Sequence, residues 1–164
     1  MAKAFPTDDS FLRGYYAPLH MECDAPNLPI SGDRPRELRG SLYRSGPNPQ
    51  FAPRGRYHWF SGDGMIHAFH VADGRVAYRN RRVRTPKWQL EHDEGEGLSG
   101  SLMSRHLSDP RILELNSTVA NTNVVWHGGR LPRADCHAAP CSRCAARGGG
   151  APDGRRPNKR TPPP

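Results

Sequence analysis

The chain has 164 residues, of which 35% are hydrophobic and 24% are charged, and its formal net charge at pH 7 is +8. It contains no apolar run of about 18 residues, so no transmembrane helix is predicted. The opening residues, MAKAFPTDDS, lack the apolar stretch of a secretory signal. The four cysteines, one in the body and three clustered near the end, do not resemble a disulfide framework. We therefore expect a cytoplasmic protein.

The last part of the chain differs sharply from the rest in composition. Residues 132–164 contain seven Arg or Lys and two Asp, so they carry +5 of the formal +8, and they contain no Ile, Leu, Val, Met, Phe, Trp or Tyr. A segment without large apolar side chains cannot bury enough surface to offset its conformational entropy. We predict that 132–164 is disordered, which leaves 1–131 to form any core.

The first predicted strand follows a proline-rich segment. Residues 1–37 read as an irregular strap, because four prolines disfavour helix at the residues before them, namely Pro18, Pro26, Pro29 and Pro35. Leu38–Ser45 is predicted to form a strand. Gly46–Pro49 is then predicted to turn or to run in polyproline form, since two prolines fix φ there.

Three strands joined by tight turns are predicted next. Tyr57–Phe60 is aromatic and β-prone, and the Gly-Asp-Gly sequence that follows favours a turn. Asp73-Gly74 separates a strand over Met65–Ala72 from one over Arg75–Thr85, and Asp-Gly between two such runs is a strong hairpin signal. Pro86 is expected to end the third strand because it lacks an N–H donor.

The remaining elements are predicted from weaker patterns. Trp88 and Leu90 extend the β-like pattern briefly, Glu91–Gly100 reads as a loop, and Ser101–His106 as a short helical turn. Thr118–Trp126 is the last β-like segment. Residues 127–130 read as a hairpin turn whose returning strand is expected to be missing after Leu131.

Four segments carry a resemblance to a known family: GSLYRSGPNPQF (40–51), YHWFSGDGMIHAF (57–69), YRNRRVRTP (78–86) and NTNVVWHGGRL (121–131). In this order they resemble the amino-terminal region of the carotenoid cleavage oxygenases, over about residues 11–131. The resemblance implies an all-β fold, a seven-bladed β-propeller of which 38–131 supplies about the first two blades. Two blades would leave unpaired strand edges and an uncovered apolar face.

The same resemblance implies the chemistry of the intact family. Its members hold Fe(II) with four histidines, one from each of four blades, and use O2 to cleave a carbon–carbon double bond of carotenoids, apocarotenoids or stilbenes. Those ligands lie beyond the NTNV segment in the family. We therefore assign no catalytic, cofactor-binding or metal residue in this chain, expect no iron to bind this fragment, and expect it to be inactive alone.

The eight histidines present are judged on their own. A separation of three residues places His67 and His70 on opposite faces of a strand, which predicts packing or hydrogen-bonding roles. His58 could approach one of them across the hairpin. The others read as isolated, solvated side chains: His20, His92, His106 and His127.

Several other groups invite a functional interpretation. The Cys136-x4-Cys141-x2-Cys144 spacing matches three of the four cysteines of a plant-type iron–sulfur loop, and His137 beside it could be a fourth ligand for zinc. Cysteines that arose by chance in a GC-rich stretch are the favoured interpretation, because short motifs match freely. We interpret Asp63 as a turn residue that caps its own backbone. Solvated acids are expected at Asp8, Asp9, Glu94 and Glu96.

Two basic runs raise the possibility of nucleic-acid binding. The first run lies on a predicted strand, so its side chains are divided between the two faces of that strand. This division favours a structural role for Arg79, Arg81, Arg82 and Arg84. The second could hold nucleic acid weakly and without sequence preference, and consists of Arg155, Arg156, Lys159 and Arg160. No specific nucleic-acid partner is expected, and a role in membrane contact is left open.

A separate hypothesis concerns the change in sequence character at Leu131. Family resemblance, large apolar residues and β patterning all stop there, and Ala, Arg, Pro and Gly are the residues that GC-only codons encode. A change of reading frame near 131 accounts for this.

Two other functions stay open: a non-enzymatic β-module that pairs through its open edge with another chain, and a nucleic-acid or metal binder that uses the basic tail.

Overall fold

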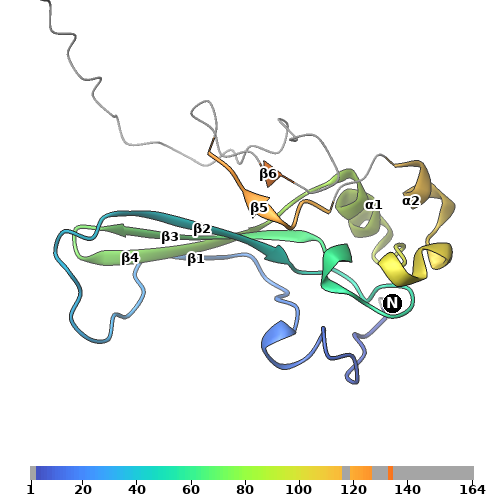
Figure 1. Ribbon diagram of the computed structural model, residues 1–164, viewed down its shortest axis with the longest axis horizontal. Helices are drawn as coiled ribbons and strands as arrows, with labels where there is room; N and C mark the ends of the chain where they lie inside the picture. The colour runs from blue at the N-terminus through green and yellow to red at the C-terminus, as the bar shows by residue number, and fades with distance from the viewer. Residues whose placement is uncertain (1–2, 116–118, 127–132, 135–164) are drawn as a thin grey trace, which may run out of the picture.

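The computed structural model in Figure 1 describes residues 3–115, 119–126 and 133–134. In this part a four-stranded antiparallel sheet has the order β1-β4-β3-β2. Its strands are β1 (Cys23–Ala25), β2 (Gly40–Pro47), β3 (Gly64–Ala72) and β4 (Arg75–Arg82). A second, two-stranded sheet pairs β5 (Asn123–Val124) with β6 (Arg133–Ala134).

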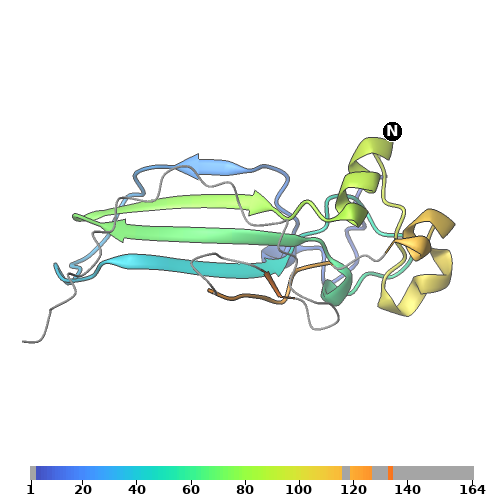
Figure 2. The same cartoon turned by 90° about the horizontal axis from the view of Figure 1, so that it is seen from above.

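Helical segments gather mainly at one end of the sheet, as Figure 2 shows from above. Among the described residues the α-helices are α1 (Pro86–Glu94) and α2 (Pro110–Glu114), and the 3-10 helices are η1 (Gly14–Tyr16), η2 (Trp59–Ser61) and η3 (Leu102–Leu107). The fold is thus mainly antiparallel β, as predicted, but the sheet is not closed and the two α-helices were not expected. None of the described helices has the length and apolarity that a membrane crossing requires.

The β3–β4 hairpin confirms the prediction made from Asp73-Gly74. Asp73 has φ 46° and Gly74 φ 82°, so both central turn residues adopt the positive φ that a tight hairpin of this kind requires. Ala72 then pairs with Arg75. The strand β4 ends at Arg82, before the predicted end at Thr85.

The edge strands differ from the prediction in position. The strand β2 covers Gly40–Pro47 rather than Leu38–Ser45, and Pro47 pairs with Gly64 at the end of an edge strand, where proline is tolerated. The strap is not wholly irregular, since it contributes η1 and β1. Buried Asn80 holds β1, because its Oδ1 accepts the Cys23 N–H at 2.6 Å.

The predicted strand at Tyr57–Phe60 is wrong, because Trp59–Ser61 forms η2. His58 Nδ1 accepts the Phe60 N–H at 3.2 Å and caps this helix. The ring of Phe11, from the strap, lies 5.0 Å from that of Trp59 and 5.2 Å from that of His58. Packing against the strap therefore outweighs the β propensity of these aromatic residues.

The helix α1 replaces the strand extension predicted at Trp88 and Leu90, and the loop begins after Glu94 rather than at Glu91. Thr85 Oγ1 accepts the Trp88 N–H at 3.1 Å, Pro86 occupies the first turn, and Gly95 ends the helix with φ 74°. Proline is well suited to a first turn because its missing N–H has no partner there anyway. The helical turn predicted at Ser101–His106 is confirmed as η3.

Thr85 provides a test of this helix start. Thr85→Val keeps the shape of the side chain and removes the capping oxygen, so we expect the free energy of unfolding to fall by about 1 kcal/mol. Urea unfolding followed by circular dichroism measures this. Gln89→Val, at an exposed position of the same helix, controls for the helix propensity of valine, and an equal loss in both variants would contradict a capping role.

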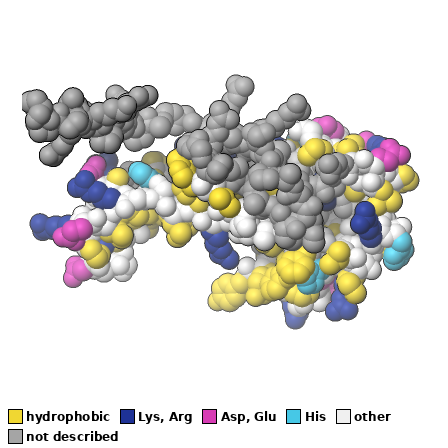
Figure 3. Space-filling view, turned by 45° about the horizontal axis from the view of Figure 1, so that its top comes forward, with side chains coloured by type: hydrophobic (Ala, Val, Ile, Leu, Met, Phe, Trp, Pro, Cys, Tyr) yellow, Lys and Arg dark blue, Asp and Glu magenta, His cyan; other side chains and the backbone are white. Residues whose placement is uncertain are grey.

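The packed core sits at the helical end. Its buried apolar side chains include Tyr57, Met65, Val83, Trp88, Leu98 and Ile112. Among the residues of β1–β4, only Gly64, Met65 and Asn80 are buried. The rest of the sheet is half-buried or exposed, and Figure 3 shows apolar side chains at the surface over the sheet as well as the helical end.

The end of the described chain corrects one expectation. A returning strand is present as β6, which pairs with β5 of the predicted 118–126 segment. This pair is short, two residues on each side. The predicted hairpin turn at 127–130, Leu131 and nearly all of the predicted disordered tail lie outside the described residues.

Candidate functional site

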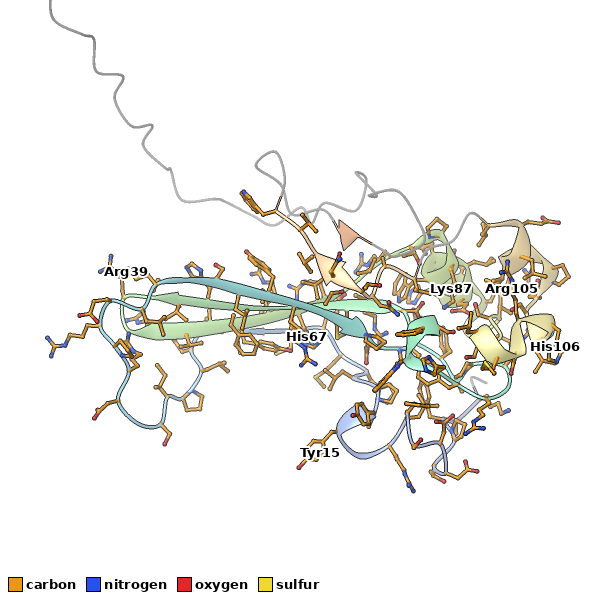
Figure 4. The ribbon with its side chains drawn as sticks, in the orientation of Figure 1. Tyr15, Arg39, His67, Lys87, Arg105 and His106 are labelled. Atoms are coloured by element: carbon orange, nitrogen blue, oxygen red, sulfur yellow. The ribbon has the colours of Figure 1, made fainter. Side chains whose placement is uncertain are left out.

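A buried cluster of three charged side chains lies where the sheet meets α1. Lys87 Nζ is 2.7 Å from Asp63 Oδ1 and 2.9 Å from Glu91 Oε2. The exposed fractions of the side chains are 8% for Lys87, 2% for Asp63 and 4% for Glu91. Figure 4 shows Lys87 on α1 at the helical end of the molecule.

The cluster joins four segments of the chain. Lys87 and Glu91 are one helical turn apart on α1, and Asp63 directly precedes β3. Asp63 Oδ2 accepts the backbone N–H of Gln50 at 3.0 Å. Glu91 Oε1 accepts two more backbone N–H groups, at 2.9 and 2.8 Å, from Leu98 and Ser99. The interpretation of Asp63 as a cap of its own turn is therefore wrong.

The electrostatics keep the Lys87 amine of this cluster protonated. Burial by itself lowers the pKa of Lys87, but the charges of Asp63 and Glu91, with their hydrogen bonds, outweigh it and raise that pKa above its ordinary value of 10.5. Burial, and then the charges of Asp63 and Asp9, raises the pKa of the neighbouring Tyr57 phenol. A protonated amine held by two carboxylates is not a nucleophile or a base.

The space beside the cluster is too small for a substrate. Its cavity measures about 10 Å³, about the room that a single water needs. The cluster's arrangement therefore suits a structural clamp between the sheet, α1 and two loops rather than a catalytic site.

A larger cleft of about 440 Å³ lies between the strap, the end of β4 and α1. Trp88 forms part of its wall, with His92 stacked 4.6 Å away and the Arg84 guanidinium 5.6 Å from the indole centroid. Arg82 is held by the carbonyl oxygens of Asn48 and Leu19. These basic and aromatic side chains of the cleft therefore each have a structural partner within the fold.

The structure confirms the hydrogen-bonding interpretation of His67 and His70. Both lie on β3, where odd spacing places them on opposite faces. His67 Nδ1 is 2.7 Å from the Tyr78 hydroxyl, and His70 Nδ1 is 2.7 Å from the Ser41 hydroxyl. Figure 4 shows His67 in the middle part of the sheet, far from Lys87.

A pH titration tests the environment of His67. Burial, and then the charge of Arg44, lowers the pKa of His67 below its ordinary value of 6.5. Because the unfolded chain binds this proton more readily, stability is complete above pH 6.5 and falls as the pH drops toward the folded-state pKa. His67→Gln, which has no charge to gain, is expected to flatten this part of a curve of unfolding free energy against pH. An unchanged slope would contradict the assignment.

The other histidines have separate surroundings. His58 caps η2 and packs among aromatic rings instead of approaching His67 or His70. His92 is exposed but belongs to α1, and its Nδ1 lies 2.7 Å from Gln50 Nε2. His20 and His106 are exposed, as predicted, and His127 lies outside the described residues. Within the described residues, no group of three or more His, Cys, Asp or Glu is placed to hold a metal ion.

The arginines of β4 and its end have structural partners, as predicted. Arg79 and Arg81 both pair with Asp24 of β1. Arg84 lies 3.6 Å from Glu22.

The expectation of solvated acids is wrong for Asp9, which accepts the Phe11 N–H at 2.9 Å and the Tyr57 N–H at 3.2 Å. Ion pairs also engage two other acids of that set, Glu94 with Arg111 and Glu96 with Arg54.

The tail motifs are not tested by the structure. The cysteine spacing and the second basic run lie outside the described residues, namely Cys136, His137, Cys141, Cys144, Arg155, Arg156, Lys159 and Arg160. The described Cys23 is a free, half-buried thiol.

Lys87 and Glu91 were not predicted from the sequence as members of a buried cluster. The available signal was the Thr85-Pro86 start and the Gly95 end of a helix, which would have put Lys87 and Glu91 on one face as an i, i+4 pair. The spacing of residues in the sequence does not show that the carboxylates of Asp63 and Glu91 are buried.

Comparisons with known proteins agree with the fold. The sequence profile of the family described as retinal pigment epithelial membrane protein matches residues 16–137. The chain is 36% identical over 128 residues to lignostilbene-alpha,beta-dioxygenase isozyme III of Sphingomonas paucimobilis, covering 77% of this chain and 26% of that protein. It is 36% identical over 136 residues to the carotenoid 9,10(9',10')-cleavage dioxygenase 1 of Phaseolus vulgaris, covering 74% and 25%.

Solved structures give the same result. The crystal structure of the lignostilbene dioxygenase of Pseudomonas brassicacearum superimposes with a TM-score of 0.74 at 32% identity, covering 85% of this chain and 29% of that one. A cobalt-substituted apocarotenoid oxygenase of Synechocystis superimposes with a TM-score of 0.58 at 29% identity, covering 75% and 27%. This chain spans about a quarter of the length of the curated relatives that it matches.

Proposed function

Because the chain belongs to the family of the carotenoid cleavage oxygenases and the retinal pigment epithelial membrane protein, we propose that it is the front part of an O2-dependent enzyme. This enzyme cleaves a carbon–carbon double bond of a carotenoid, an apocarotenoid or a stilbene and forms two carbonyl products. The observation that carries the proposal is the superposition on a lignostilbene dioxygenase over 85% of the chain. Relatives named as carotenoid and resveratrol cleavage enzymes support the range of substrates.

We propose that the four-stranded sheet is one blade of a seven-bladed propeller and that β5 and β6 begin the next. The antiparallel order β1-β4-β3-β2 suits a blade. The helices gathered at one end of the strands would then lie on one of the two flat faces of the propeller.

We propose that Fe(II) serves the intact enzyme and that its four histidine ligands lie outside this chain. A relative prepared with cobalt in place of its metal supports a metal cofactor in the family. The described histidines do not fit such a site, because His67 and His70 face opposite sides of β3 and each is engaged by a hydroxyl group. The chain alone is then inactive.

Metal analysis and an oxygenase assay test this function. The purified 164-residue chain, mixed with Fe(II), is expected to retain no stoichiometric iron and to cleave neither an apocarotenal nor a stilbene. A chimera that carries residues 11–126 in place of the matching region of the P. brassicacearum enzyme is expected to bind iron and cleave stilbenes. Turnover by the chain alone would contradict the proposed location of the ligands, and a folded, iron-loaded but inactive chimera would contradict the proposed function.

Two further proposals concern the protein's origin and location. We propose that the change in composition after Leu131 reflects a change of reading frame. Resequencing of the locus tests this: a one- or two-base shift should restore an apolar, β-patterned continuation.

We also propose a cytoplasmic location, which the free thiol of Cys23 suits. Cell fractionation with an antibody against the chain tests this location.

A further inference from the structure

The cleft between the strap, the end of β4 and α1 is large enough to hold a small molecule. Its volume of about 440 Å³ lies in the range of ligand pockets, which measure about 300–1,000 Å³. The side chains that line it include Glu22, Gln50, Arg82, Arg84, Trp88 and His92. Their contacts within the fold leave part of their charge and hydrogen-bonding capacity unused.

The lining of the cleft carries an excess of positive charge. Arg82 and Arg84 contribute two guanidinium groups, and Glu22 is the one carboxylate among the described lining residues. Glu22 Oε1 accepts the backbone N–H of Arg82 at 2.7 Å, so this carboxylate is already engaged by the protein. Two guanidinium groups in one cleft repel a cation and attract an anion.

Arg84 keeps hydrogen-bond donors for a ligand. Its Nη2 lies 3.6 Å from Glu22 Oε2, which is longer than a hydrogen bond, and its side chain is 65% exposed. The guanidinium carbon lies 5.6 Å from the centroid of the Trp88 ring, and this contact helps to hold it at the cleft. Arg82 differs, because its Nη atoms already donate to two backbone carbonyl oxygens. Arg82 therefore adds charge to the cleft, and Arg84 adds both charge and donors.

Two buried atoms of the lining residues lack hydrogen-bond partners. Trp88 is 6% exposed, and its indole Nε1 has no acceptor among the described residues. Gln50 Oε1 is also buried without a donor there, although Nε2 of the same amide lies 2.7 Å from His92 Nδ1. A buried N–H without an acceptor destabilises the free chain, and an incoming acceptor removes that cost. Both atoms are closed to solvent, so the wall has to open slightly before a ligand oxygen reaches the indole N–H.

We propose that this cleft binds an oxyanion, the carboxylate or phosphate group of a small molecule. The Arg84 guanidinium presents parallel N–H donors that match the paired oxygens of such a group. Arg82 adds a second positive charge, and the indole N–H of Trp88 supplies a neutral donor. The inference goes beyond the proposed function, because cleavage of a carbon–carbon double bond does not call for an oxyanion site.

Nuclear magnetic resonance tests the proposal on the isotope-labelled full chain. Sodium phosphate and sodium benzoate are titrated separately at constant pH, with sodium chloride at matched ionic strength as the control for screening. We expect phosphate, benzoate or both to shift the indole N–H signal of Trp88 and to saturate with a dissociation constant of about 1 mM or lower. Trp88→Phe identifies that signal by its loss. Saturation by benzoate alone indicates a carboxylate ligand, and saturation by phosphate alone indicates a phosphorylated one.

A pair of arginine variants locates the binding. Arg84→Gln should weaken it by about tenfold or more, because the charge and the paired donors are lost. Arg79→Gln is the matched control, since Arg79 also pairs with an acid of the strap, Asp24, but does not line the cleft. It should leave the dissociation constant within about twofold.

Several outcomes would overturn the proposal. These are an indole signal that neither anion shifts, a shift that does not saturate, an equal shift with chloride, and equal weakening by Arg84→Gln and Arg79→Gln. The wild-type titration decides the proposal even where Arg84→Gln does not fold. The presence or absence of cleavage activity does not enter this test, so its result is separate from that of the proposed function.

Discussion

Lys87→Met is expected to reduce the free energy of unfolding by about 3–5 kcal/mol. The substitution keeps much of the side-chain length and removes the charge between Asp63 and Glu91, both nearly fully buried. Removing one partner of a buried ionic group leaves uncompensated charge, which costs about this amount. Urea unfolding monitored by tryptophan fluorescence measures the change, since Trp88 is adjacent on α1.

Gln89→Met is the matched control for this prediction, because Gln89 is exposed on the same helix. It should change stability by less than about 0.5 kcal/mol. The raised pKa of Lys87 adds a second signature: its stabilising contribution is complete below pH 10.5 and is lost as the pH rises through the higher folded-state pKa. A Lys87→Met variant as stable as the wild type would contradict the clamp.

Gly64→Ala is expected to detach the 119–126 segment from the start of β3. A Cβ atom at Gly64 would overlap the Ala120 carbonyl oxygen and lie 3.0 Å from Val83 Cγ2. The obstacle is largely backbone, and the Gly64 N–H donates to Val119 O at 2.8 Å, so the strand cannot shift without losing that bond. We expect a loss of about 3 kcal/mol, at the upper end of overpacking effects.

Gly46→Ala is the control for this second prediction. Gly46 lies on the adjacent strand β2, and a Cβ atom there would meet nothing within 4 Å. Hydrogen exchange should rise in 119–126 for Gly64→Ala alone. Equal protection of that segment in both variants would show that close approach to Ala120 is not what requires glycine at 64.

Local patterns predicted the centre of the sheet well. The Asp73-Gly74 turn and the alternation around it locate β3 and β4 because both signals act within a few residues. The same alternation placed His67 and His70 on opposite faces. The order of the motifs also identified the family, which neither composition nor periodicity could do.

The errors arose where distant contacts decide local structure. The strand predicted at Tyr57–Phe60 became η2 because the strap brings Phe11 against Trp59. The strand β1 escaped prediction because it depends on Asn80, whose side chain accepts a hydrogen bond from a residue 57 positions earlier. The helix α1 was missed although its cap and terminal glycine were visible, because Pro86 was interpreted only as the end of a strand.

The candidate site was the least predictable part. Asp63 read as a turn residue because flanking glycines favour turns, and nothing nearby in the sequence reveals that Lys87 approaches it. Pairing of the two depends on where α1 packs, which is set by residues from four segments.

The distance in sequence between β1 and its Asn80 clamp has a consequence for synthesis. Asn80 follows Cys23 by 57 positions, and ribosomes add about 5–20 residues per second. The strap therefore emerges roughly 3–11 seconds before the strand that receives it exists. During that time residues 3–37 have no docking place in the sheet and are open to chaperones and proteases, so the amino-terminal part of this protein is made first and docks late.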